Sequence, residues 1–143
     1  MEKIISTGEL YRMISTNPEN FEQKIVENDE IFIQTTVSGK LTELMNRHGK
    51  QPSDIISKSL LSKSYFYQVL QGERQPSREA LIKMGIVCEC NADEIQHLLL
   101  IAGEGVLYPK IRRDAAILFC IGKKMSLYET DEFLTEIGEK GLF

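Results

Sequence analysis

The apolar positions of this chain recur with the period of a helix over most of its length. The clearest stripe follows the i, i+3, i+4, i+7 spacing of one buried helix face, at Ile95, Leu98, Leu99 and Ala102. Strand-like alternation is confined to the short segment IFIQTTV at residues 31–37. The pattern predicts an all-α chain of at least six helices, with no sheet of more than two strands.

Start and stop signals divide this pattern into helices joined by short links. Side chains suited to N-caps are Asn17, Gln51, Ser62, Asn91 and Ser126. Prolines that suit a first turn are Pro18, Pro52, Pro76 and Pro109, and glycines that suit a stop are Gly49, Gly72 and Gly103. We therefore expect helices at 8–14, 18–28, 38–49, 52–61, 62–70, 77–88, 91–102, 110–122 and 126–137.

The net charge of −4 is unevenly distributed. Residues 1–38 carry 3 basic and 7 acidic side chains, residues 39–85 carry 8 and 4, and residues 86–143 carry 6 and 10. Only the middle segment is net positive, by +4, which indicates an anionic partner there. A chance fluctuation among solvated faces is the competing explanation.

Length and composition exclude several classes of protein. A chain of 143 residues can bury a core, and 42% hydrophobic with 27% charged residues is ordinary for a globular domain. No apolar run approaches the roughly 18 residues of a membrane span, and the N-terminal MEKIISTGELYR lacks the apolar segment of a secretion signal. Three cysteines fit a reducing compartment better than a disulfide framework. We expect a cytoplasmic protein without membrane contact.

The segment SKSYFYQVLQGERQPS at 62–77 carries three consecutive aromatic residues and a basic turn. Its setting, residues 40–102, resembles the Cro/repressor-type (XRE-like) helix-turn-helix family of bacterial and phage DNA-binding proteins. The matching residues are Ile55, Ile56, Ser62, Phe66, Val69, Gly72, Pro76, Leu81, Met84, Gly85, Cys88, Asn91, Glu94 and Ile95. Four positions depart from the family pattern. Ile56 keeps an inward position but stands where a small residue is usual, Leu60 replaces the turn glycine, and the other two are Pro52 and Leu70. The end of the chain, from LYPKIRRDAAILF, resembles the tail of a subset of these regulators.

This resemblance implies a five-helix, lambda-repressor-like core with additional flanking helices. The expected parts are an N-terminal helical extension at 1–36, a DNA-binding domain at 37–102 and a C-terminal helical pair at 103–143. Within the domain the helix-turn-helix spans 53–71 and the recognition helix spans about 62–71. The expected function is a sequence-specific transcriptional regulator that occupies double-stranded DNA as a homodimer.

In the register of the family, Phe66 faces inward and the opposite side of its helix faces the major groove. The expected DNA-binding residues are Lys63, Ser64, Tyr65, Tyr67, Gln68, Arg74 and Arg78. Lys63 suits guanine, Gln68 suits adenine, and Arg74 and Arg78 suit phosphates. Packing against the N-terminal extension is the alternative for both tyrosines.

A second class of function remains open, in which the scaffold binds a protein partner through its acidic N- or C-terminal helices and has little DNA affinity. We expect no enzyme, no catalytic residue, no cofactor and no metal site. Cys88, Cys90 and Cys120 lie at apolar positions and have no histidine at metal-ligand spacing. The cluster at 112–114 (Arg-Arg-Asp) is expected to fix the tail by salt bridges, with anion binding as the alternative. A monomer is expected to expose Leu142 and Phe143, which favours a dimer.

Overall fold

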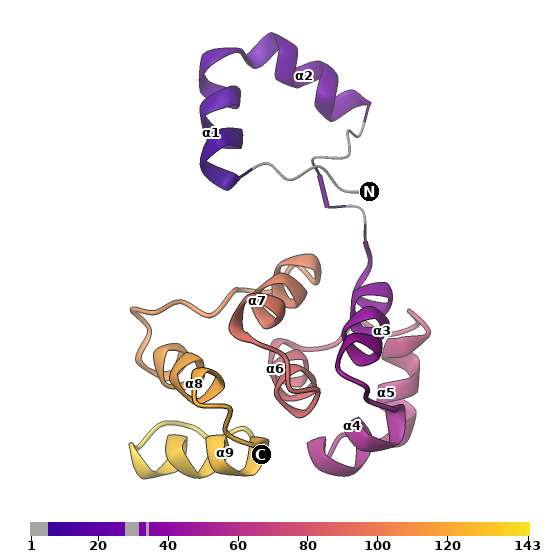
Figure 1. Ribbon diagram of the computed structural model, residues 1–143, viewed down its shortest axis with the longest axis vertical. Coiled ribbons are helices and arrows are strands. Elements are labelled where there is room, and N and C mark those ends of the chain that lie inside the picture. Colours follow the sequence, from indigo (N-terminus) through magenta and orange to yellow (C-terminus); the bar gives the residue numbers. More distant parts are fainter. Residues whose placement is uncertain (1–5, 28–31, 34) are drawn as a thin grey trace. The chain divides into compact units, whose positions relative to one another are not determined.

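The computed structural model describes residues 6–27, 32–33 and 35–143, and these residues form nine helices and no strand. The chain is all-α, as predicted, and divides into two compact units, Met1–Gln34 and Thr35–Phe143 (Figure 1). The helices of the first unit are α1 (Thr7–Thr16) and α2 (Pro18–Val26). Those of the second are α3 (Val37–Arg47), α4 (Pro52–Ser59), α5 (Lys63–Leu70), α6 (Arg78–Val87), α7 (Ala92–Ile101), α8 (Arg112–Gly122) and α9 (Leu127–Glu136). Among the described residues, no helix has both the length and the apolar character to cross a membrane.

The first unit is a pair of short helices in which Phe21 is buried and stands edge-on to Phe32, with ring centroids 5.9 Å apart. The predicted cap Asn17 precedes α2, but its side chain makes no capping hydrogen bond. Its backbone N–H instead donates to Met13 and closes α1 at 3.0 Å. The strand-like segment 31–37 contains two positions outside the described residues, and Val37 already belongs to α3.

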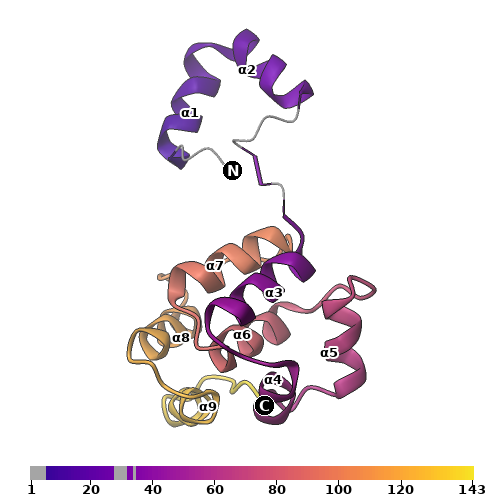
Figure 2. The same cartoon turned by 45° about the vertical axis from the view of Figure 1, so that its right-hand side comes forward.

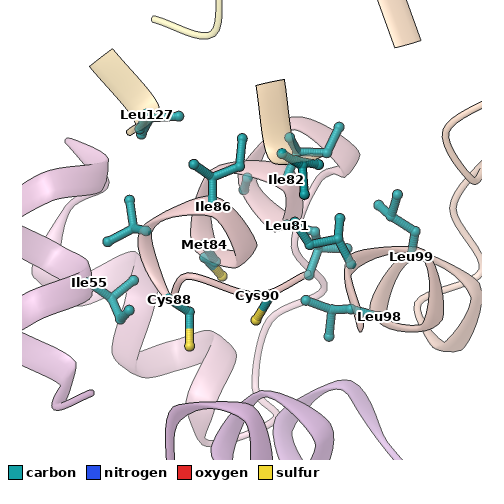
Figure 3. Close-up of a cluster of buried hydrophobic side chains, with 14 of the residues drawn as sticks. Ile55, Leu81, Ile82, Met84, Ile86, Cys88, Cys90, Leu98, Leu99 and Leu127 are labelled. Carbon is teal, nitrogen blue, oxygen red and sulfur yellow. The ribbon is translucent and has the colours of Figure 1, made fainter. Parts of the chain in front are cut away.

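The second unit is built around α6, which packs against α4, α7 and α9. Figure 3 shows its side chains Leu81, Met84 and Ile86 within a cluster that also draws on α4, α7 and α9. The contact with α7 is close because Gly85 has no side chain. A Cβ there would lie 2.6 Å from Cγ1 of Ile95, so any larger residue would require Ile95 or the helices to move.

Two helices begin later than their prolines predict. Pro76 is buried in the link, and α6 starts at Arg78 because the Ser77 hydroxyl accepts the Ala80 N–H at 3.1 Å. Pro109 lies in a turn closed by the Ile111 N–H on the Tyr108 carbonyl. Proline therefore marks the approach to these helices rather than their first turn, since its fixed φ suits a turn equally well.

The C-terminal helices α8 and α9 belong to the same unit as residues 37–102. Arg113 fixes the tail by pairing with Glu79 of α6 and by donating to the Lys140 and Gly141 carbonyls. Leu142 was expected to be exposed in a monomer, and this prediction is wrong. It is 3% exposed, and its N–H donates to Asp131 at 2.7 Å. Phe143 is exposed, with the Lys83 ammonium 5.4 Å from its ring centroid.

Candidate nucleic-acid interface

Helices α4 and α5 are short and are joined by Leu60, Leu61 and Ser62. The start of α4 is fixed by the Gln51 N–H, which donates to the Asp54 carboxylate at 2.8 Å. Leu60 then ends α4 in the left-handed conformation, with φ 61° and ψ 16°. Glycine adopts this conformation more readily than leucine. The Ser62 hydroxyl accepts the Tyr65 N–H at 3.1 Å and caps α5, as predicted.

The inner face of α5 anchors the helix in the core. Phe66 and Val69 are 0% and 1% exposed, and α5 packs against α3 and α4. The opposite face carries Lys63, Ser64 and Tyr67, all exposed. Figure 2 shows α5 at an edge of the second unit, away from α8 and α9. One side of this helix is therefore held rigidly while the other remains accessible.

Gln68 and Arg74 meet beside this exposed face. The Arg74 guanidinium donates to the Gln68 carboxamide oxygen at 3.3 Å, and the Gln68 nitrogen donates to Ser64 at 3.5 Å. Arg74 follows α5 by four residues, and Gly72 reverses the chain between them with φ 76°. Three of the expected DNA-binding residues thus form one hydrogen-bonded set.

The two cations on this side of α5, Lys63 and Arg74, make no ion pair within the second unit, although Glu73 precedes Arg74 in the chain. Within residues 35–143, neither Lys63 nor Arg74 forms an ion pair with a carboxylate. Arg74 lies instead over the Tyr65 ring, with its guanidinium carbon 4.9 Å from the centroid. Two cations without an ion pair, one on the helix and one in the turn that follows it, favour an anionic partner.

The two tyrosines of α5 have different environments. Tyr65 is half-buried and its hydroxyl accepts the Ser77 N–H at 3.1 Å. Tyr67 is 37% exposed and packs edge-on to Phe66 at 6.3 Å. Tyr65 therefore links α5 to the start of α6, whereas Tyr67 is exposed.

Arg78 also lies away from the exposed face of α5. Its guanidinium donates to the carbonyls of Gly105 and Val106 at 2.7 and 3.1 Å, and to the Asp114 carboxylate at 2.9 Å. Asp114 is buried, so this pair ties α6 to α8 inside the unit. Sequence could not reveal this role, because the partners lie 27 to 36 positions away.

A second group of polar residues was not found from the sequence. A ring nitrogen of His48, Sγ of Cys90 and a carboxylate oxygen of Glu94 lie within 4.8 Å of one another. His48 follows α3, Cys90 lies in the link between α6 and α7, and Glu94 is in the first turn of α7. The only sequence signal was the Asn91 cap, which receives the Glu94 N–H at 2.8 Å while its own N–H donates back to Glu94.

Hydrogen bonds set the charge of this second group. Burial raises the pKa of the Glu94 carboxyl, but bonds from the Asn91 N–H, Arg47 and His48 outweigh burial and bring the pKa below its ordinary value. The pKa of the Cys90 thiol is raised, first by a hydrogen bond with Cys88 and then by burial. The cluster thus pairs an ionised carboxylate with a protonated thiol.

A comparison of the chain with models of known protein families, with curated proteins and with solved structures finds no match.

Proposed function

We propose that the chain is a sequence-specific DNA-binding regulator that inserts α5 into the major groove. The observation that carries this proposal is the two-sided character of α5. Phe66 and Val69 fix its inner face in the core, while Lys63, Ser64 and Gln68 lie together on the outer side with Arg74 beside them. A helix of this kind can be held against a groove without losing its packing.

Each outward side chain has a distinct chemical role in this proposal. Lys63 can donate to O6 and N7 of guanine, and Gln68 can bond both N6 and N7 of adenine. Gln68 must first exchange its bond from Arg74 for a bond to the base. Arg74 is then released to bind a backbone phosphate, which sets the register of the protein on the duplex. Ser64 and Tyr67 complete the contact surface.

The resemblance to the XRE-like family supports this proposal through helix order and spacing. Five helices, α3 to α7, lie within residues 37–102, the range to which the resemblance assigns the DNA-binding domain. Tyr65 and Arg78 leave the proposed contact set, because the first positions α6 and the second pairs with Asp114. The N-terminus of α6 and Arg74 remain as the expected phosphate contacts.

A homodimer is part of the proposal, since two copies can place two recognition helices one DNA turn apart, roughly 34 Å. Exposed aromatic residues on α8 and α9 support it, with Phe119 at 48% and Tyr128 at 70% exposure. Sedimentation equilibrium of the full chain with and without DNA tests this part. A chain that stays monomeric in both conditions contradicts the dimer but not the DNA contact.

The decisive experiment is selection of bound duplexes from a random DNA pool, followed by fluorescence anisotropy on the enriched sequence. We expect binding to the enriched duplex at least 1,000-fold tighter than to a scrambled one at the same salt concentration. The double variant Lys63→Ala/Gln68→Ala should abolish this preference. The matched control Lys110→Ala removes an equal charge from the link before α8 and should preserve it. Equal affinity of the wild type for all duplexes would contradict sequence-specific reading.

A protein-interaction module is the second candidate function, favoured by Leu60. This leucine is 73% exposed in the turn between α4 and α5. An apolar side chain exposed to water does not stabilise the fold, so a partner that covers it is favoured. The two candidates respond differently to Leu60→Ala. A DNA-binding regulator should retain its DNA affinity, whereas a protein partner that docks on the turn should lose its contact.

A further inference from the structure

We infer that His48, Cys90 and Glu94 form a binding site for a transition-metal dication of the zinc class. This site is separate from the exposed face of α5. The three side chains come from three different elements, yet their ligand atoms lie within 4.8 Å of one another. They supply one nitrogen, one sulfur and one oxygen. These are the three ligand types that Zn²⁺ takes from proteins.

The distances are close to those that a tetrahedral ion requires. Zn–N and Zn–O bonds of about 2.0–2.1 Å place the two ligand atoms about 3.3 Å apart. Nε2 of His48 lies 3.0 and 3.1 Å from the two oxygens of Glu94. An ion can therefore replace the hydrogen-bonding proton between His48 and Glu94 if the two side chains move slightly apart. The Cys90 sulfur must approach to about 3.5 Å from both, given a Zn–S bond of about 2.3 Å.

The surroundings leave room for the ion and for a fourth ligand. All three side chains line one cavity of about 590 Å³, bordered on its other side by residues of α8 and the α8–α9 link, including Met125. Cys90 and Glu94 are buried, whereas His48 is half-buried and can admit an ion from solvent. Three protein ligands facing a cavity leave one position for water or a small molecule.

The existing hydrogen bonds hold the carboxylate in place without occupying it fully. The Glu94 oxygens accept from the Asn91 N–H at 2.9 Å and from Arg47 at 2.7 Å. Each oxygen has two lone pairs, so each retains the one that now accepts from His48. Hydrogen-bond donors of this kind orient a metal-binding carboxylate and raise the affinity of the site for the ion.

The Cys90 thiol must lose its proton when the ion binds. Zn²⁺ binding converts the Cys90 thiol to a thiolate, and its proton passes to the buffer through the cavity. A histidine that binds an ion through Nε2 is neutral and carries its remaining proton on Nδ1. With one thiolate and one carboxylate, the bound dication is electrically balanced. At about pH 8, where an ordinary imidazole is neutral, binding should release about one proton per ion.

The test is titration of the reduced, full-length protein with Zn²⁺ by calorimetry in two buffers of different ionisation enthalpy. We expect one ion per chain, release of about one proton and a raised midpoint of thermal unfolding. Mg²⁺ and Ca²⁺ should not bind, because they prefer oxygen ligands. Absence of Zn²⁺ binding would overturn the inference.

Cys90→Ser is the critical variant, and Cys120→Ser is its matched control, since Cys120 is also buried but lies outside the cluster. Cys90→Ser should weaken Zn²⁺ binding more than tenfold and remove the sulfur-to-metal absorption band of the Co²⁺ form. His48→Gln should weaken binding similarly, with His97→Gln as control. Equal losses in the variants and their controls would show non-specific binding and contradict the site. If Cys90→Ser does not fold, retention of the Co²⁺–sulfur band in Cys120→Ser and its loss in His48→Gln still decide the matter.

Discussion

The hydroxyl of Tyr65 accepts the backbone N–H of Ser77 at 3.1 Å and so joins α5 to the residue that caps α6. The same ring lies under the Arg74 guanidinium. An aromatic residue on the proposed recognition helix thus fixes the loop that follows it. The ring itself positions Arg74, the cation that we propose for a phosphate contact.

Tyr65→Phe removes this bond and keeps the ring. We expect the free energy of unfolding to fall by about 0.5–1.5 kcal/mol, because the Ser77 N–H loses its protein acceptor. The cation–π contact of Arg74 should survive. Urea denaturation provides the measurement, and Tyr67→Phe is the matched control, expected to change stability by less than about 0.5 kcal/mol. Similar losses in both variants would contradict the structural role of Tyr65.

Leu60→Gly should stabilise the protein. Leu60 has φ 61°, a conformation that costs an L-residue about 1–2 kcal/mol and glycine almost nothing. Glycine also has greater freedom in the unfolded chain, which offsets part of this gain. The net increase in the free energy of unfolding is about 0.5–1 kcal/mol. Thermal and urea unfolding test the prediction. Leu60→Ala removes the exposed side chain but keeps the Cβ, so a gain of equal size there would show that strain is not the cause.

Local signals in the sequence predicted most of the helix boundaries. Ser62, Asn91 and Ser126 were predicted as caps, and each accepts the N–H three residues later. A cap depends only on neighbouring residues, so sequence is sufficient. The prolines were less informative because Pro76 and Pro109 fit the turns before their helices.

Contacts between distant residues could not be predicted in the same way. Arg78 was assigned to a phosphate from its place in a basic turn, but its partners Gly105, Val106 and Asp114 come from the chain after α7. His48 and Glu94 lie 46 positions apart. Only the packing of α3 against α7 brings them together. No periodicity in either segment reports that contact.

Stability should decrease in acid partly through Glu94. Its pKa is lowered in the folded chain, since hydrogen bonds outweigh the opposing effect of burial. A lowered pKa contributes stability above the unfolded value, about 4.3, and this contribution is lost as pH falls through the folded value. Urea denaturation between pH 3 and about 6 should therefore show a slope that Glu94→Gln makes shallower. Some slope should persist, because the pKa of Glu129 is also lowered, by hydrogen bonds from Ser126. An identical slope in the variant would contradict this assignment.

Arg78→Ala should destabilise the second unit strongly. The change leaves the carboxylate of Asp114 buried, and among the described residues the Tyr108 N–H is then its one remaining hydrogen-bond donor. Loss of one partner from a buried ion pair costs about 3 kcal/mol or more. Arg112→Ala is the control, since Arg112 pairs with Glu139 at the surface and should cost less than about 1 kcal/mol. A small effect of Arg78→Ala on stability together with a large loss of DNA affinity would contradict this assignment and indicate that Arg78 contacts DNA.

Gln68→Ala and Arg74→Ala should weaken DNA binding in different ways. If Gln68 reads a base, its loss costs about 1–3 kcal/mol on the enriched duplex and little on a scrambled one. If Arg74 binds one phosphate, its loss weakens both duplexes alike and reduces the slope of log affinity against log salt concentration by about one unit. Anisotropy titrations at several salt concentrations measure both effects.

The bond between these two side chains adds a further expectation, because Gln68 and Arg74 must separate before each can bind DNA. In Arg74→Ala, Gln68 has already lost this partner, so its bond to the base no longer carries the cost of breaking it. The loss caused by Gln68→Ala should therefore be larger in the Arg74→Ala background than in the wild type. A double-mutant cycle on the enriched duplex measures this difference. Strict additivity would mean that the bond breaks at no cost or persists on DNA, and in the second case Gln68 would position Arg74 rather than read a base.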